Sequence, residues 1–114
     1  MEKDRKSIGL TPQTQKILAD IEGQGWFRDA QDIARFALAY AVKTNVPEGT
    51  TENTETRWAV GNFDDTGEIK TLLGAIYPGC ETPVKLMEHL VNEGLKLLAR
   101  KLESGTTNPA DLMR

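Results

Sequence analysis

The segment from Ala30 to Val42 constrains the fold more than any other, because it predicts a helix that is apolar on nearly every side. Asp29, with Asp32 three residues later, is typical of a helix start. The apolar positions are Ile33, Ala34, Phe36, Ala37, Leu38, Tyr40, Ala41 and Val42. A helix with this pattern has to be covered all round. A chain of 114 residues has few layers with which to cover it. We therefore expect a central helix and, in addition, self-association of the chain.

The composition fits one ordinary globular domain over residues 1–114, with 39% hydrophobic and 27% charged residues. The net charge is −3, divided unevenly, because residues 1–46 carry 7 basic and 6 acidic side chains while residues 47–114 carry 7 and 11. This excludes a broad basic surface for nucleic acid. Any contact with DNA is expected to be local and N-terminal.

The start of the chain lacks the apolar core of a signal peptide, and no stretch approaches the roughly 18 uninterrupted apolar residues of a membrane span. We expect a cytoplasmic protein with no membrane partner.

The first 43 residues predict a strand followed by two helices, over residues 5–43. Ile8 and Leu10 alternate with polar residues, as in a short strand. Thr11-Pro12 is typical of a helix start, and the apolar stripe that follows predicts a helix over residues 12–22. Residues 29–42 form the second helix.

A polar, Thr-rich segment at residues 44–56 predicts a mobile loop before a second unit at residues 57–103. Residues 57–63 alternate like a strand, and Asp65 is expected to cap a helix that carries Ile69, Leu72, Leu73 and Ile76. Thr82-Pro83 opens the longest helix, with Glu88 and Asn92 among the positions expected to face solvent. Residues 104–114 are expected to be a flexible tail.

The two units show the same predicted order of elements, a strand followed by two helices, which suggests an internal repeat. A shift of 53 residues places Asp29 on Thr82 and Ala41 on Gly94. Small residues at positions 41 and 94 would let two helices approach closely. A true duplication and a chance match of helical patterns both remain open. The predicted fold class is mainly α with short strands, that is, α+β with possible tandem strand–helix–helix units.

Residues 5–43 resemble the ribbon-helix-helix family, in which two short strands pair antiparallel and their outward side chains enter the DNA major groove. The resemblance implies possible DNA contacts at Arg5, Lys6 and Ser7. Ser7 and Gly9 stand where base-reading proteins usually place Arg, Lys, Asn or Gln. The outward positions therefore depart from the family pattern.

A second resemblance covers more of the chain. The Ala-rich run Asp32–Ala41, the polar loop, Arg57-Trp58, an acidic turn at Asp64–Gly67 and the final Leu86–Leu95 look like small accessory proteins encoded beside DNA phosphorothioation (Dnd-type) and related phage-restriction systems. This resemblance implies a non-enzymatic subunit of a multi-protein defence complex, and it transfers no active-site residue.

The sequence offers no catalytic set, metal site or cofactor motif. Residues 62–73 imitate a calcium loop, but Leu73 stands where a bidentate Glu is needed. His89 is the one histidine and Cys80 the one cysteine, and neither has a partner spaced for catalysis or metal binding.

Large aromatic side chains stand out in otherwise polar stretches, and two interpretations of them remain open. They cover the core of a small domain, or some of them form an oligomer or partner interface, where aromatic residues are frequent anchors. The interface candidates are Trp26, Phe27, Phe36, Tyr40 and Trp58.

Two functions follow as expectations. The first is an interaction subunit of a DNA-targeting bacterial modification–restriction complex, whose partners are other copies of itself and larger defence proteins. The alternative is a ribbon-helix-helix transcriptional regulator or antitoxin that binds DNA.

Overall fold

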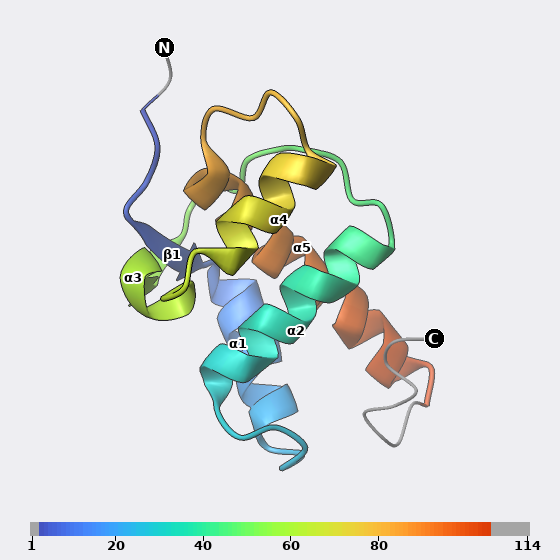
Figure 1. Ribbon diagram of the computed structural model, residues 1–114. Helices are drawn as coiled ribbons and strands as arrows, with labels where there is room; N and C mark the ends of the chain where they lie inside the picture. The colour runs from blue at the N-terminus through green and yellow to red at the C-terminus, as the bar shows by residue number, and fades with distance from the viewer. Residues whose placement is uncertain (1–2, 106–114) are drawn as a thin grey trace.

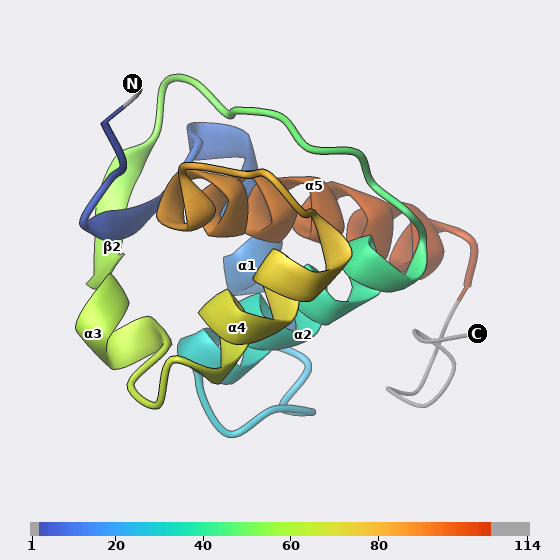
Figure 2. The ribbon, with the colours of Figure 1, turned by 45° about the horizontal axis from the view of Figure 1, so that its top comes forward.

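A long C-terminal helix forms the axis of the computed structural model, which describes residues 3–105 (Figures 1 and 2). This helix, α5, spans Pro83–Glu103, and helix α2, Ala30–Lys43, packs against it more extensively than any other pair of elements. Gly94 lies so close to Ala37 that a Cβ at position 94 would overlap the Ala37 carbonyl oxygen. The predicted close approach at a small residue is confirmed at Gly94.

The elements predicted for the first unit are confirmed. Strand β1 spans Ser7–Leu10, helix α1 spans Pro12–Glu22, and α2 follows. Thr11 caps α1 reciprocally with Thr14, because each side chain accepts a hydrogen bond from the other residue's backbone N–H. Ile8 and Leu10 are fully buried, as the alternation predicts.

Strand β2, Glu55–Ala59, pairs antiparallel with β1 in a two-stranded sheet. The register sets Ile8 opposite Trp58 and Gly9 opposite Thr56, so Arg57 is an extra residue in a β-bulge. Both strands come from one chain.

The start of the second unit differs from the prediction. Val60–Phe63 forms a short helix, α3, and is not part of the strand. The chain turns here because Phe63 is fully buried, and a strand continuing along the sheet edge would carry it away from the core. Helix α4 spans Glu68–Ile76. Its cap is Asp64 and not Asp65, since the Asp64 carboxylate accepts hydrogen bonds from the backbone N–H groups of Ile69 and Lys70, both at 3.0 Å.

Two polar residues of α5 lie inside the protein, contrary to the prediction that they face solvent. Glu88 is 2% exposed and Asn92 is fully buried. Lys85 and Lys96 are partly exposed and Arg100 is exposed, as expected for the outer face.

The polar loop is attached to the helices and does not run free. Residues 44–54, here called the strap, cross over α5 on their way to β2 (Figure 2). Thr51 Oγ1 lies 2.9 Å from His89 Nδ1, Thr54 Oγ1 donates to Glu88 Oε2, and the Tyr77 hydroxyl donates to the Val46 carbonyl oxygen at 2.7 Å.

The fold is mainly helical α+β with a two-stranded antiparallel sheet, as predicted. Helices α2 and α5 begin 53 residues apart, in agreement with the proposed shift, whereas β1 and β2 begin 48 residues apart. Helix α3 has no counterpart in the first unit. Of the predicted tail, Ser104 and Gly105 form a turn, and residues 106–114 lie outside the described residues.

Candidate functional site

A buried carboxylate, that of Glu88, contacts two separate segments of the chain, the N-terminal residues 5–9 and the strap. Its Oε2 accepts a hydrogen bond from the backbone N–H of Gly9 at 2.8 Å and another from Thr54 Oγ1 at 3.2 Å. Its Oε1 forms an ion pair with the Arg5 guanidinium, whose side chain is 28% exposed. A buried carboxylate is tolerated only when it is paired and hydrogen-bonded in this way.

Asn92, one helical turn further along α5, completes the same arrangement. Its Nδ2 donates to the carbonyl oxygens of Gly9 and Glu88, at 3.0 and 2.7 Å. Its Oδ1 accepts from Thr14 Oγ1 at 2.5 Å and from the backbone N–H of Thr11 at 3.3 Å. Glu88 and Asn92 therefore supply the hydrogen-bond acceptor and donor that a neighbouring strand would otherwise offer to the backbone of Gly9 in β1. We call Arg5, Gly9, Glu88 and Asn92 the polar clasp.

The N-terminal segment holds the start of α5 as well. The Asp4 carboxylate accepts hydrogen bonds from the backbone N–H groups of Val84 and Lys85, at 3.0 and 2.9 Å. Thr82, the residue at the N-cap position, makes no side-chain cap. The cap of the longest helix thus comes from one residue that lies 80 positions before Val84, which local sequence patterns do not reveal.

The three residues predicted to contact DNA are placed differently from one another. Arg5 is engaged by Glu88, and its Nη1 also donates to the Thr51 carbonyl oxygen at 3.4 Å. Lys6 is exposed. Ser7 is partly buried, and its Oγ lies 3.2 Å from Thr56 Oγ1. Among the predicted contacts, Lys6 alone has an unengaged, exposed side chain in the described structure.

The predicted aromatic interface does not form one exposed patch. Tyr40 is only 6% exposed and belongs to the core. Phe27 and Phe36 pack edge to face with ring centroids 5.1 Å apart, and Trp58 packs beside Phe63 at 6.0 Å. Trp26, like Phe27, Phe36 and Trp58, is partly buried against the core. The interpretation that aromatic residues cover the core accounts for these contacts.

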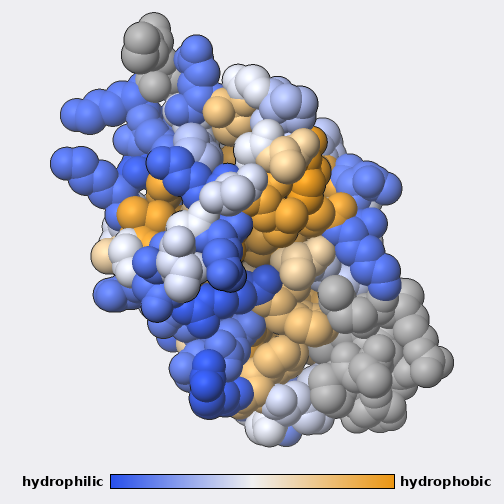
Figure 3. Space-filling model, in the orientation of Figure 1, coloured by the Kyte–Doolittle hydropathy of each residue, from blue (hydrophilic) through white to orange (hydrophobic). Residues whose placement is uncertain are grey.

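Among residues 3–105, the large apolar side chains that are exposed lie on α4 instead. Leu72 is 50% exposed and Ile76 is 42% exposed, while Leu73 on the same helix is buried. Apolar surface gathers over α4 and extends toward α2 in the view of Figure 3. All three residues belong to the apolar stripe of this helix, yet only Leu73 is buried, whereas Leu72 and Ile76 are exposed. We call these two residues the α4 face.

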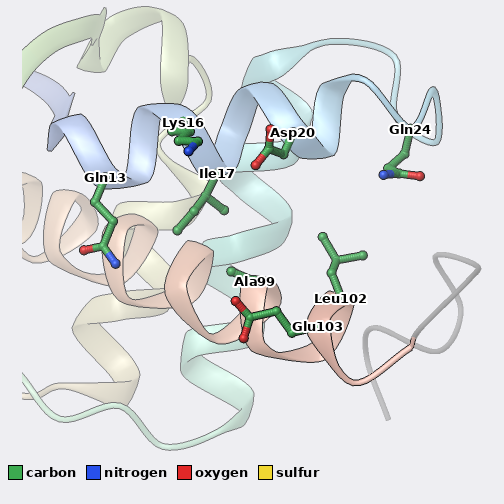
Figure 4. A pocket seen from close by; sticks show the side chains of 8 residues that line it. All are labelled: Gln13, Lys16, Ile17, Asp20, Gln24, Ala99, Leu102 and Glu103. Atoms are coloured by element: carbon green, nitrogen blue, oxygen red, sulfur yellow. The ribbon is translucent and has the colours of Figure 1, made fainter.

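A groove of about 610 Å³ lies between α1 and the C-terminal end of α5 (Figure 4). Its apolar lining is Ile17, Ala99 and Leu102, and charged side chains from both helices border it. The charged and polar residues that line it are Gln13, Lys16, Asp20, Gln24 and Glu103. None is buried, so the groove is open to solvent.

His89 lies beneath the strap. Its Nδ1 is hydrogen-bonded to Thr51, and Gly49 leaves so little room that a Cβ there would lie 2.7 Å from His89 Nε2. Burial lowers the pKa of His89 below its ordinary value of 6.5, opposed by the charge of Glu93 and reinforced by Lys96. The imidazole therefore favours its neutral form in the folded protein.

Within residues 3–105 no three His, Cys, Asp or Glu side chains gather in a way that could hold a metal ion. Cys80 is a partly buried free cysteine. No helix in this range has both the length and the apolarity needed to cross a membrane.

Comparison of the chain with protein families, with curated proteins and with solved structures gives no match.

Proposed function

We propose that this chain is a cytoplasmic, non-enzymatic interaction subunit of a DNA-targeting bacterial modification–restriction complex, and that it acts by self-association and by binding larger subunits. The observation that carries the proposal is the α4 face, since Leu72 and Ile76 remain about half exposed on an otherwise well-packed chain. Exposed apolar surface of this kind is typical of interaction sites. The assignment to defence rests on the resemblance of residues 32–41 and 86–95.

The partner part of the proposal is tested by replacing the α4 face. The tagged chain is expressed in its host together with the proteins encoded by the genes that neighbour its own, and stable complexes are purified. We expect the wild-type chain to retain a named larger subunit, and L72S/I76S to lose it. The matched control is K70S, which changes an exposed polar residue of the same helix. Recovery of the wild-type chain alone, or undiminished retention by L72S/I76S, overturns the partner part.

The self-association part is tested by light scattering on the purified chain over micromolar concentrations. A mass that rises above that of one chain supports it. A constant mass of one chain at every concentration overturns it.

A second candidate function, a ribbon-helix-helix regulator, is favoured by the sheet. Strands β1 and β2 pair antiparallel. The last helix after each strand, α2 after β1 and α5 after β2, packs against the other. The engagement of Arg5 by Glu88 weighs against it, because it leaves less positive charge for phosphates. The test is binding to the upstream promoter across a salt series, which phosphate contacts make steeply salt-dependent. We expect K6A to weaken such binding, and an absence of binding at low salt removes this candidate.

A further inference from the structure

The two edges of the sheet differ. The outer edge of β1 is filled by the side chains of Glu88 and Asn92. Strand β2 lies at the margin of the molecule (Figure 2), and four of its five residues are exposed, Trp58 being the partly buried one. Within residues 3–105, no hydrogen bond from another segment reaches the outer edge of β2. Such an edge is a ready template for another strand.

The clasp identifies which residue of β2 presents its backbone to this edge. Gly9 gives its N–H to Glu88 and its carbonyl oxygen to Asn92, so both groups point away from β2. Gly9 and its opposite residue, Thr56, are therefore a non-hydrogen-bonded pair of the antiparallel ladder. In such a pair the backbone groups of both residues point outward. The N–H and carbonyl oxygen of Thr56 accordingly face the open edge.

The charges beside Thr56 are complementary to those of a second, antiparallel copy of the same strand. Glu55 and Arg57 flank it, both are exposed, and neither forms an ion pair with another described residue. If two β2 strands pair antiparallel with Thr56 on the two-fold axis, each Glu55 lies opposite the other copy's Arg57. A register with Arg57 on the axis would instead set two like charges opposite each other, which is destabilising. The charge pattern therefore selects one register.

We propose that a second copy of this chain pairs along β2, antiparallel and with Thr56 on the axis, so that the two sheets join into one of four strands. The interface is isologous, as two-fold symmetry requires. The opposite charges both stabilise this register and disfavour pairing with strands that lack the matching pattern. This inference rests on the self-association part of the proposed function and names its surface.

The first test exchanges the two charges. We expect R57E and E55R, measured by light scattering, each to raise the dimer dissociation constant at least about tenfold, because each makes the opposed pairs alike in charge. The double variant E55R/R57E restores the opposition in the same register, and we expect it to regain the dimer. E52R, which changes an exposed residue of the strap outside the strand, is the matched control and should dimerise like the wild type. Circular dichroism verifies that every variant is folded.

The second test probes the axis directly, in a C80S background. Residues that form a hydrogen-bonded antiparallel pair have Cα atoms about 5.5 Å apart, within reach of a disulfide. We expect T56C to form a covalent dimer under mild oxidation, and A59C, which lies away from the axis, to remain monomeric on a denaturing gel.

The outcomes separate the inference from the function on which it rests. A dimer that survives R57E and E55R unchanged, or that cross-links through A59C and not T56C, overturns pairing along β2 with Thr56 on the axis but leaves self-association standing. A wild-type chain that stays monomeric at every concentration overturns both, while partner binding through the α4 face is decided separately by co-purification.

Discussion

At the scale of single residues, one buried carboxylate joins segments that are far apart in the sequence. Glu88 on α5 holds the N-terminal Arg5, the backbone of Gly9 in β1, and Thr54 at the end of the strap. Removing it would leave a buried backbone N–H and a partly buried guanidinium without their partner. When one partner of a buried pair is removed, most of the lost stability comes from the polar groups that are left buried without a partner.

We predict that E88A lowers the free energy of unfolding by about 2–4 kcal/mol, at the lower end of the range for buried pairs because Arg5 is partly exposed. E93A is the matched control, since Glu93 lies on the same helix and forms a surface ion pair with Lys96. Its loss should cost less than about 1 kcal/mol. Urea unfolding of the two variants beside the wild type measures both values. Equal losses in E88A and E93A would contradict a structural role for the clasp.

His89 makes the stability of the fold depend on pH. Its pKa in the folded chain is lowered by burial, whereas in the unfolded chain it returns to about 6.5. The unfolded state then binds more protons just below pH 6.5, so stability is greatest above that pH and falls as the pH drops toward the folded pKa. Comparing urea unfolding of the wild type and H89Q at pH 7.5 and 5.5 measures this contribution. We expect the wild type to lose more stability than H89Q on acidification, and a loss of equal size in both would contradict the prediction.

The sequence predicts the burial of Ile8 and Leu10 but not that of Glu88 and Asn92. Helical periodicity shows which positions lie on the apolar stripe of a helix. Glu88 and Asn92 are polar, so the periodicity predicts that both face solvent. What places them inside is the unpaired edge of β1, whose Gly9 N–H and carbonyl oxygen need partners. That requirement is visible only once β1 and α5 are known to touch.

At the scale of elements, the crossing of α2 and α5 is the principal contact of the fold. It depends on Gly94, because the Ala37 carbonyl oxygen occupies the space that a side chain at position 94 would take. The obstacle is backbone and cannot rotate aside, so a larger residue must separate the helices.

We predict that G94A destabilises the protein by about 3 kcal/mol, since overpacking against a fixed neighbour strains both helices. The same change at Gly74 in α4 is the control, because a Cβ there meets nothing within 4 Å. G74A should be neutral or stabilising by up to about 1 kcal/mol, reflecting the better helix propensity of Ala. Thermal unfolding followed by circular dichroism compares them. A G94A variant as stable as G74A would contradict this prediction, because it would mean that α2 and α5 can move apart without loss of stability.

The helices α1, α2 and α5 are predictable because each combines a start signal with a long apolar stripe. The segment at Val60–Phe63 is not, since its alternation mimics a strand while the burial of Phe63 demands a turn. Helix α4 is predicted in position, but the sequence does not show which of its apolar residues are exposed. Its stripe carries more apolar residues than α5 covers, so Leu72 and Ile76 stay outside although their spacing is that of a core face. The α4 face is therefore an outcome of tertiary packing.

At the scale of the whole molecule, the two halves of the chain complete each other. The sheet needs one strand from each half, and the main helix pair is α2 from the first with α5 from the second. The polar clasp likewise joins Arg5 and Gly9 to Glu88 and Asn92. The sheet, the main helix pair and the polar clasp therefore all lie between the two halves.

We therefore predict that the chain divided between Glu52 and Asn53, two exposed residues of the strap, gives fragments that are unfolded alone and fold when mixed. Each fragment by itself leaves α2 or α5 with an uncovered apolar face, and helices in proteins owe most of their stability to the packing of that face. The measurement is far-UV circular dichroism of each fragment and of the equimolar mixture, where helical signal should exceed the sum of the parts. Carrying G94A in the second fragment should weaken reassembly, because the α2–α5 contact is what drives it. Independent folding of either fragment would instead mean that one half holds a sufficient core, and the shared core would no longer explain why the two halves occur in one chain.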